Sequence, residues 1–254
     1  MKIALITGAT SGIGKATAIK LAETGYDIII TGRRNDRLIE FGNDIMHKFN
    51  RKVKSLCFDI RNKTEVFNAI NSLDEDWKNI DILVNNAGLA AGLDLLNEGS
   101  TDDWEQMIDT NIKGILFITR VVVQNMIERK TGHIVNISSI AGKEVYEKGN
   151  VYCATKHAVD ALTKGMRIDF LKHNIKVTSV SPGAAETEFS MVRFKDDKEK
   201  AGKVYEGFTP LYAEDIADAI IFAVTRPAHV NINDMLIMAT AQANACYTNR
   251  NTEN

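Results

Sequence analysis

Ile3-Ala-Leu-Ile6-Thr7-Gly8-Ala-Thr-Ser-Gly12-Ile-Gly14 is the stretch of sequence that decides the fold. Residues 2–7 predict a short buried strand, and residues 15–24 predict a helix that ends at Gly25. Glycines between a strand and a helix let the backbone approach a pyrophosphate, whose charge is met by the N–H groups at the helix start. The stretch therefore predicts a phosphate-binding turn, with a plain tight turn as the alternative.

The rest of the chain continues this alternation of strands and helices. Further strands are predicted at 27–31, 53–59, 80–85, 133–138, 176–181 and 234–238, and helices at 35–50, 64–73, 151–172 and 213–224. Another helix is predicted from Thr101 to about Lys130, with a break near Asn111 and a C-terminal glycine at Gly132. The rhythm predicts an α/β fold, a doubly wound parallel sheet flanked by helices. Because no repeat or linker interrupts the pattern, residues 1–254 are predicted to form one domain.

Composition and charge exclude several classes of protein. The formal net charge of -2 argues against non-specific nucleic-acid binding, which needs a basic surface. No apolar run approaches the roughly 18 to 20 residues of a membrane span, and the N-terminus lacks the architecture of a signal peptide. Cys57, Cys153 and Cys246 are scattered without metal-ligand spacing. We expect a cytoplasmic protein with reduced thiols, no metal site and no membrane or nucleic-acid partner.

The end of the second predicted strand carries two arginines, Arg33 and Arg34. An NAD-selective site usually has an acid near this position, which binds the ribose 2′-hydroxyl. A guanidinium instead pairs with a 2′-phosphate. We therefore predict NADP(H) as the cofactor. Asp59 ends the third predicted strand, where it could either meet the adenine amino group or act as a helix cap before Arg61.

Tyr152 and Lys156 are four residues apart in a predicted helix, so their side chains share one face. A cation beside a phenol favours the phenolate and would lower the tyrosine pKa. The pair is a candidate acid/base, and Ser139 is a candidate for holding the substrate oxygen, with Ser138 as its less favoured neighbour. The alternative is a packed tyrosine and an exposed lysine. Residues 188–210 are charged and irregular, which suggests a mobile lid, and the polar tail 241–254 is expected to be loose.

These motifs together resemble the short-chain dehydrogenase/reductase family. They are Thr7-Gly8-x-x-x-Gly12-Ile13-Gly14, Asn85-Asn86-Ala87-Gly88, Asn111, Ser139, Tyr152-x-x-x-Lys156 and Pro182-Gly183-x-x-x-Thr187. Residues 81–89, 107–111, 192–195 and 227–233 are similar to those of bacterial NADP-dependent 3-hydroxy acid (serine) dehydrogenases and of the related sulfoacetaldehyde reductases. Two features depart from that pattern: the charged loop with Lys143-Glu144 and Glu147-Lys148, and the absence of a proline before Thr240.

The resemblance implies a single NADP-binding Rossmann-fold catalytic domain and a role for each motif residue. Tyr152 would supply the proton, Lys156 would lower the tyrosine pKa and bind the nicotinamide ribose, Ser139 would hydrogen-bond the substrate oxygen, and Asn111 would hold a water. The implied cofactor-binding residues are Thr7, Gly8, Thr10, Ser11, Gly12, Ile13, Gly14, Arg33, Arg34, Asp59, Ile60, Asn86, Ala87, Gly88, Lys156, Pro182, Gly183 and Thr187. A small acid substrate would contact Ser139, Tyr152, Arg193 and Lys148, with Lys195 and Lys143 as weaker candidates for its anionic group.

The expected activity is NADP(H)-dependent interconversion of short 3-hydroxy acids and their semialdehydes. Serine, 3-hydroxypropionate and 3-hydroxyisobutyrate represent the substrate class. The runner-up is a sulfoacetaldehyde reductase, and a non-catalytic NADP(H)-sensing regulator is the alternative from another class. The resemblance also implies a homo-oligomer, expected to be a tetramer.

Overall fold

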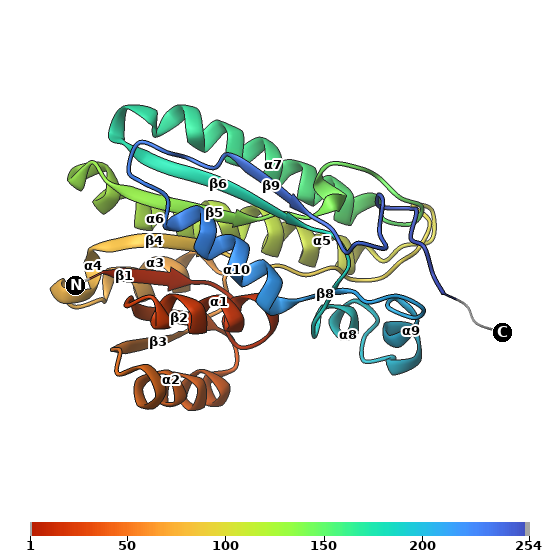
Figure 1. Cartoon of the computed structure of the whole chain (residues 1–254), viewed down its shortest axis with the longest axis horizontal. Coiled ribbons are helices and arrows are strands. Elements are labelled where there is room, and N and C mark those ends of the chain that lie inside the picture. The colour runs from red at the N-terminus through yellow and green to blue at the C-terminus, as the bar shows by residue number, and fades with distance from the viewer. Residues whose placement is uncertain (1, 252–254) are drawn as a thin grey trace.

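The computed structural model describes residues 2–251 and has a seven-stranded parallel sheet at its centre (Figure 1). The strands are β1 (Ile3–Ile6), β2 (Asp27–Gly32), β3 (Val53–Cys57), β4 (Ile80–Asn85), β5 (Gly132–Ile137), β6 (Ile175–Pro182) and β9 (Asp234–Ile237). Their order in the sheet is β3-β2-β1-β4-β5-β6-β9, and all neighbours are parallel. The predicted doubly wound parallel sheet is confirmed.

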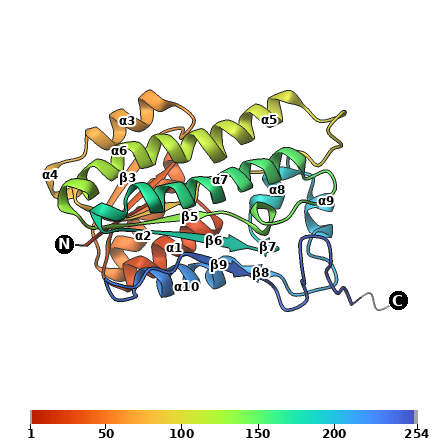
Figure 2. The same ribbon diagram turned by 90° about the horizontal axis from the view of Figure 1, so that it is seen from above.

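Helices cover both faces of the sheet (Figure 2). One face carries α1 (Gly12–Glu23), α2 (Asn35–Phe49) and α10 (Ala213–Val224). The other carries α3 (Lys63–Asn71), α6 (Gly114–Arg129) and α7 (Asn150–Asp169), with the short α4 (Glu75–Lys78) at one end. Alternate β1 residues face the two layers, so Ile3 and Leu5 join one buried apolar cluster and Ala4 and Ile6 the other.

The predicted break in the helix before residue 130 is confirmed. α5 (Thr101–Ile108) runs through a π-helical turn, Asp109–Lys113, before it continues as α6, and Asn111 lies in that turn. The prediction for Gly132 is wrong. Lys130 ends α6 in the left-handed conformation with φ 54°, while Gly132 already belongs to β5.

The lid region has more secondary structure than its charged sequence suggests. It contains α8 (Phe189–Arg193) and α9 (Lys198–Lys203), and it is flanked by β7 (Ala185–Glu186) and β8 (Leu211–Tyr212), which pair with each other. In Figure 1 these elements lie at the end toward which the arrows of the sheet point, so the lid covers the carboxyl edge of the sheet.

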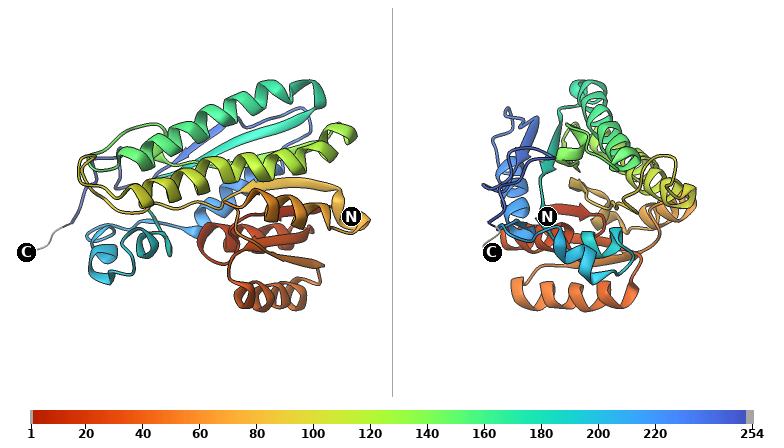
Figure 3. Two further views of the ribbon diagram at one scale, coloured as in Figure 1. Left: turned by 180° about the vertical axis from the view of Figure 1, so that it is seen from behind. Right: turned by 90° about the vertical axis from the view of Figure 1, so that its right-hand side faces the viewer.

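The C-terminal tail lies beside the lid (Figure 3). Its backbone is hydrogen-bonded to itself, from Asn249 N to the Ala241 oxygen (2.8 Å), and to the lid, from Asn251 N to the Gly207 oxygen (2.7 Å). The expectation of a loose tail is therefore wrong for residues 241–251, and residues 252–254 lie outside the described part of the chain. Within residues 2–251, no helix combines the length and apolar composition needed to cross a membrane.

Candidate active site

The phosphate turn lies where the sheet order reverses, between β1 and β4. The Thr7 hydroxyl accepts hydrogen bonds from the backbone of Asn86 (3.0 Å) and Ala87 (2.9 Å). The Asn86 amide in turn donates to the backbone oxygens of Thr7 (2.8 Å) and Gly8 (3.1 Å). These bonds join the ends of the two strands at the switch point, where doubly wound sheets bind their ligands.

Two glycines make this turn possible. Gly8 has φ +65°, and a Cβ on it would lie 2.9 Å from the Ala87 Cα atom. A Cβ on Gly14 would lie 2.4 Å from the Asn86 amide nitrogen. The first turn of α1 contains no acidic residue, and its N-cap Ser11 makes no capping bond with its side chain. The helix start therefore keeps its N–H groups and positive dipole for an anion.

A cleft of about 650 Å³ runs along the carboxyl edge of the sheet and collects most of the predicted residues. They are Gly8, Thr10, Ser11, Gly12, Ile13, Arg33, Arg34, Asp59, Ile60, Asn86, Ala87, Gly88, Ser139, Tyr152, Lys156, Pro182, Gly183, Thr187 and Arg193. Thr7, Gly14, Asn111 and Lys148 do not line it. Thr7 and Gly14 shape the turn from behind, and Thr187 packs on Gly12, where an added Cβ would lie 3.2 Å from the Thr187 Cβ.

The two arginines after β2 differ in their surroundings. The Arg34 guanidinium donates to the hydroxyls of Thr10 (2.6 Å) and Ser11 (3.1 Å) and pairs with Glu188 at 2.9 Å. Within the described residues the Arg33 side chain makes no ion pair. Arg33 therefore keeps its charge available to the cleft, while Arg34 is part of a network that joins the phosphate turn to the start of the lid.

Asp59 binds Arg61 rather than capping the next helix. The Arg61 guanidinium donates to both carboxylate oxygens, at distances of 2.6 to 3.0 Å. The N-cap of α3 is Asn62, whose side chain accepts from the backbone of Thr64 and Glu65. The capping alternative is therefore wrong. Although burial acts to raise the pKa of Asp59, the bonds from Arg61 lower it overall, so the carboxylate stays ionised in the wall of the cleft.

Tyr152 and Ser139 meet inside the cleft. Tyr152 is buried in the first turn of α7, and its ring packs against Phe189 of the lid, with ring centroids 5.6 Å apart. Burial raises the pKa of Tyr152, and the hydrogen bond with Ser139 only partly offsets this. The tyrosine is therefore protonated at neutral pH.

Lys156 is buried one turn further along α7, and its ammonium donates to the Ile137 oxygen at 3.0 Å. Its Nζ atom lies 5.9 Å from the centre of the Tyr152 ring. Burial lowers the pKa of Lys156 to about 8. Burial is the dominant influence on both groups, and the expectation that this lysine lowers the tyrosine pKa stays a prediction.

Asn111 lies behind the cleft and bonds to the loop after β4. Its amide donates to the Leu89 oxygen (2.8 Å) and to the Thr155 hydroxyl (3.0 Å), and its carbonyl accepts from Leu89 N (2.9 Å). These bonds use both ends of the side chain. Asn111 thus connects the π-helical turn to α7 next to Lys156.

Arg193 is the cation nearest to Tyr152 among the predicted substrate contacts. Its guanidinium carbon lies 5.7 Å from the centre of the Tyr152 ring. Nη1 donates to the Tyr146 hydroxyl (3.0 Å) and Nε to the Gly92 oxygen (3.2 Å). Nη2 is buried and has no hydrogen-bond partner among the described residues. An unpaired buried donor costs free energy, so this nitrogen is suited to an anionic ligand.

The other candidate cations point elsewhere. Lys195 pairs with Asp103 at 2.9 Å, and Lys143 binds Asp160 at 2.5 Å. Lys148 borders a very small pocket beside Gly92, whose lining also includes Tyr152 and Arg193. Lys148 does not line the large cleft, and its contact with the substrate stays a prediction. Its backbone is in the left-handed region there, with φ 62°.

The C-terminal tail forms part of the cleft wall, which its sequence did not predict. The tail residues in its wall are Gln242, Ala245, Thr248 and Arg250. The Gln242 side-chain oxygen accepts from Ala184 N at 2.8 Å, beside the Pro182-Gly183 turn. The Arg250 guanidinium donates to the backbone oxygens of Val204 (3.0 Å) and Glu206 in the lid. Polar composition carried no signal for these contacts, because they depend on segments far apart in the chain.

Comparisons with known proteins agree with this geometry. The model of the family described as short chain dehydrogenase matches residues 2–198. A probable NADP-dependent dehydrogenase from Haemophilus influenzae is 47% identical over 94% of both chains. A sulfoacetaldehyde reductase from Chromohalobacter salexigens is 41% identical over 95% of both. The solved closed form of serine dehydrogenase complexed with NADP+ superposes with a TM-score of 0.91 at 43% identity, covering 96% of this chain and 97% of the other.

Proposed function

This chain belongs to the short-chain dehydrogenase family, and on that premise we propose that it is an NADP(H)-dependent oxidoreductase of short 3-hydroxy acids and their semialdehydes. Serine, 3-hydroxypropionate and 3-hydroxyisobutyrate represent the substrate class. One observation carries the proposal: the unpaired guanidinium nitrogen of Arg193 lies in the same cleft as Tyr152 and Ser139. The cleft thus combines two hydroxyls that can hydrogen-bond a carbonyl oxygen, those of Tyr152 and Ser139, with a cation that can bind a carboxylate, that of Arg193.

The residues of the cleft fit NADP(H). Gly8 and Gly14 leave room for a pyrophosphate against the backbone, and the acid-free start of α1 favours its charge. No acid stands at the end of β2, where Arg33 and Arg34 can pair with a 2′-phosphate. When bound, the cofactor supplies or accepts the hydride.

Tyr152 has the protonation state that carbonyl reduction needs. Because burial keeps its pKa high, the phenol holds a proton that it can donate to the substrate oxygen. Ser139 would donate a hydrogen bond to the same oxygen, and Lys156 would bind the ribose hydroxyls near the nicotinamide. We further propose that a water beside Asn111 links Lys156 to solvent, which the π-helical turn at this residue favours.

Two alternatives are distinguished by substrate. A sulfoacetaldehyde reductase would place a sulfonate at Arg193, and one of the relatives carries that name. An NADP(H)-sensing regulator would bind the cofactor without turnover, but it has no need of Ser139 and a buried Tyr152 in one cleft.

We propose a homotetramer in the cytoplasm as the working form of this single catalytic domain. Exposed apolar side chains lie on the α5–α7 layer at Ile108, Leu116 and Ile168, which supports pairing of these helices between subunits. The cysteines are free thiols, as expected in a reducing compartment.

An NADPH oxidation screen tests the activity. It compares malonic semialdehyde, sulfoacetaldehyde and an acetoacetyl thioester at equal concentrations. We expect the highest kcat/KM with malonic semialdehyde. A clear preference for the sulfonate would select the alternative reductase, and tight NADPH binding without any oxidation would favour the regulator.

The variant Tyr152→Phe tests the assignment of the acid. It should keep NADPH binding and lose turnover by about 10²- to 10⁴-fold, the usual contribution of general acid–base catalysis. NADPH affinity is measured by fluorescence titration in parallel. A Tyr152→Phe variant with nearly full activity would exclude this residue as the proton donor.

A further inference from the structure

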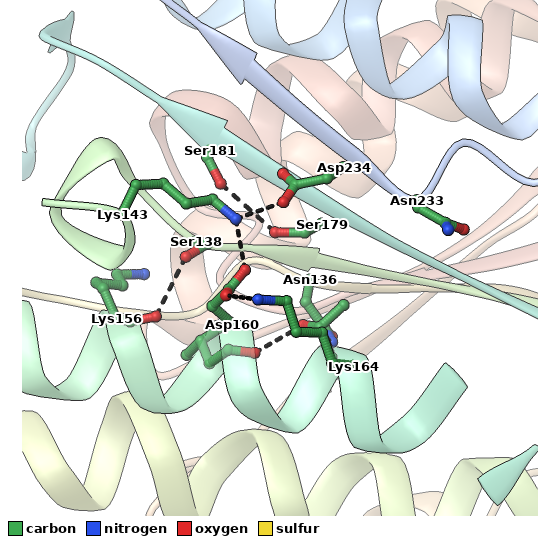
Figure 4. A network of polar contacts seen from close by, with 12 residues as sticks. Asn136, Ser138, Lys143, Lys156, Asp160, Lys164, Ser179, Ser181, Asn233 and Asp234 are labelled. Atoms are coloured by element: carbon green, nitrogen blue, oxygen red, sulfur yellow. Dashed lines mark hydrogen bonds and ion pairs between the residues drawn. The ribbon is translucent and has the colours of Figure 1, made fainter. Parts of the chain in front are cut away.

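A cluster of four charged side chains lies behind the catalytic helix (Figure 4). The Lys143 ammonium binds Asp160 at 2.5 Å and also binds Asp234. The second oxygen of Asp160 pairs with Lys164 at 2.7 Å. The Lys143 and Asp160 side chains are mostly buried, with 23% and 13% of their surface exposed, whereas Lys164 is 62% exposed. The bond between Lys143 and Asp160 is therefore the inner, better shielded one.

Lys143 joins three segments that come from distant parts of the chain. Lys143 follows the 3₁₀ turn Ile140–Gly142, which begins directly after Ser139. Asp160 lies on α7, one turn beyond Lys156. Asp234 is the first residue of β9. A single ammonium thus connects the loop that carries Ser139 to the helix that carries Tyr152 and Lys156.

The segment between Ser139 and Lys143 is short and hydrogen-bonded throughout. The Ser139 hydroxyl accepts from Ala141 N (3.1 Å), its carbonyl accepts from Gly142 N (2.8 Å), and Lys143 N donates to the Ile140 oxygen (2.9 Å). A displacement of Lys143 is therefore transmitted to Ser139 through a stiff turn.

Gly142 rests directly on the catalytic helix. A Cβ on it would lie 2.7 Å from the Lys156 oxygen and 2.6 Å from the Ser138 hydroxyl. Ser138 itself donates to that same Lys156 oxygen at 3.3 Å. This close approach leaves the loop few possible positions against α7. The ion pairs of Lys143 favour the position that the loop has in this structure.

The cluster stays charged at neutral pH. Burial acts to lower the pKa of Lys143, but its bonds with Asp160 and Asp234 raise it overall. The pKa of Asp160 is lowered by bonds from Lys143 and Lys164, against the effect of burial. The bond is thus an ion pair in a partly buried place, where removing one partner costs more than at an exposed site.

We propose that Lys143 is a positioning residue for the reaction: by binding Asp160 and Asp234 it holds Ser139 in register with Tyr152 on α7. The inference rests on the proposed function of Ser139. It also explains the charge of this loop, since Lys143 points away from the substrate and into the cluster. Lys143 itself contacts neither substrate nor cofactor.

The test compares Lys143→Met with Lys143→Arg and Lys164→Met. Lys143→Met should lower kcat about tenfold, because a displacement of up to 1 Å at a reacting group can cost about 10²-fold. KM and the Kd of NADPH should stay within about twofold, since the proposed anion contact at Arg193 and the phosphate turn are untouched. Lys143→Arg should restore most of kcat. Lys164→Met removes a charge from the same Asp160 without touching the loop, so its kcat should be unchanged.

A double-mutant cycle with Ser139→Ala separates this inference from the proposed function. If Lys143 acts through Ser139, adding Lys143→Met to Ser139→Ala should cause little further loss of kcat. Equal losses from Lys143→Met in both backgrounds would overturn the positioning role. A fully active Ser139→Ala would instead overturn the proposed function of that serine.

Asp234→Asn provides a second route if Lys143→Met does not fold. Asp234 lies at the more exposed end of the cluster, with 39% of its side chain exposed, so its change is the milder one. We expect a smaller loss of kcat with the same unchanged KM. A kcat of Asp234→Asn equal to that of the parent protein, together with equal losses from Lys143→Met in both backgrounds of the cycle, would show that the cluster does not position Ser139. If only Asp234→Asn can be measured, a kcat equal to that of the parent protein is enough to exclude this role.

Discussion

Replacing Arg193 by methionine is the substitution that most directly tests the substrate class. Nε of Arg193 donates a hydrogen bond to the Gly92 oxygen and Nη1 donates one to the Tyr146 hydroxyl. Nη2 has no partner among the described residues and is left for the substrate. One hydrogen bond to a charged group contributes about 1.5–3 kcal/mol. Its loss should therefore reduce kcat/KM for an acidic substrate by about 10- to 150-fold.

The assay compares two aldehydes that differ in charge but little in size. NADPH oxidation is followed with malonic semialdehyde and with the uncharged propanal, for the parent protein and for Arg193→Met. The ratio of the two kcat/KM values isolates the anion contact, because Arg193 also fastens the lid to Gly92 and a looser lid would slow both substrates. Lys195→Met is the matched control, since Lys195 is a nearby lid cation that pairs with Asp103.

An equal loss with both aldehydes would refute the reasoning. Arg193 would then be a structural link between the lid and the loop after β4, and the acid group would have to be bound elsewhere. A changed ratio in Lys195→Met would refute it as well, because general surface charge would then account for the preference.

Three further outcomes are expected. Replacing Arg33 and Arg34 by alanine should raise the Kd of NADPH about tenfold or more and change the Kd of NADH little. Titrations that give an unchanged ratio of the two Kd values would contradict the 2′-phosphate contact. His133 is buried with a pKa lowered to about 3 by burial and by Lys176, so the stability that its neutral form contributes is lost as pH falls below about 6.5. At about pH 5 the free energy of unfolding should be about 2 kcal/mol lower than at neutral pH because of this group. Urea unfolding of His133→Gln should lack this part of the acid sensitivity. A pH dependence identical to that of the parent protein would show that His133 is not its source. Arg250→Ala should free the tail from the lid carbonyls and speed its proteolysis, and a tail cleaved no faster would show that Arg250 is not what holds it.

The raised pKa of Tyr152 changes the interpretation of the acid/base pair. Sequence spacing predicted that a lysine one turn away would lower the tyrosine pKa. In the fold both groups are buried, and burial disfavours the charged form of each, so the pKa of Tyr152 rises, the pKa of Lys156 falls and the two values move apart. Tyr152 is therefore protonated at neutral pH, which is the form that donates a proton in carbonyl reduction.

Much of the fold could be predicted because its determinants are local. The Ile-rich strands, the turn from Thr7 to Gly14 and the helix around Tyr152 each follow from the periodicity and turn chemistry of neighbouring residues. The order of strands in a parallel sheet then places all the carboxyl ends at one edge. That is why most of the predicted cofactor residues line one cleft.

The remaining errors share a physical cause. Lys143 and Lys195, two of the candidate substrate cations, instead pair with carboxylates, because a charged residue in a turn has many partners within reach of its side chain. Which partner it binds depends on segments that are far away in the chain. The tail was expected to be loose for the same reason, since Gln242 and Arg250 find their partners 58 and 46 residues away.

The sequence by itself therefore determined the sheet, the phosphate turn and the face that Tyr152 shares with Lys156, because strand, turn and helix preferences act within a few residues. Only the tertiary structure decided how deeply Tyr152 and Lys156 are buried, which cation keeps an unpaired nitrogen beside them, and what holds the Ser139 loop on α7. These properties come from packing and from ion pairs between distant segments, whose strength depends on the burial that the whole fold creates.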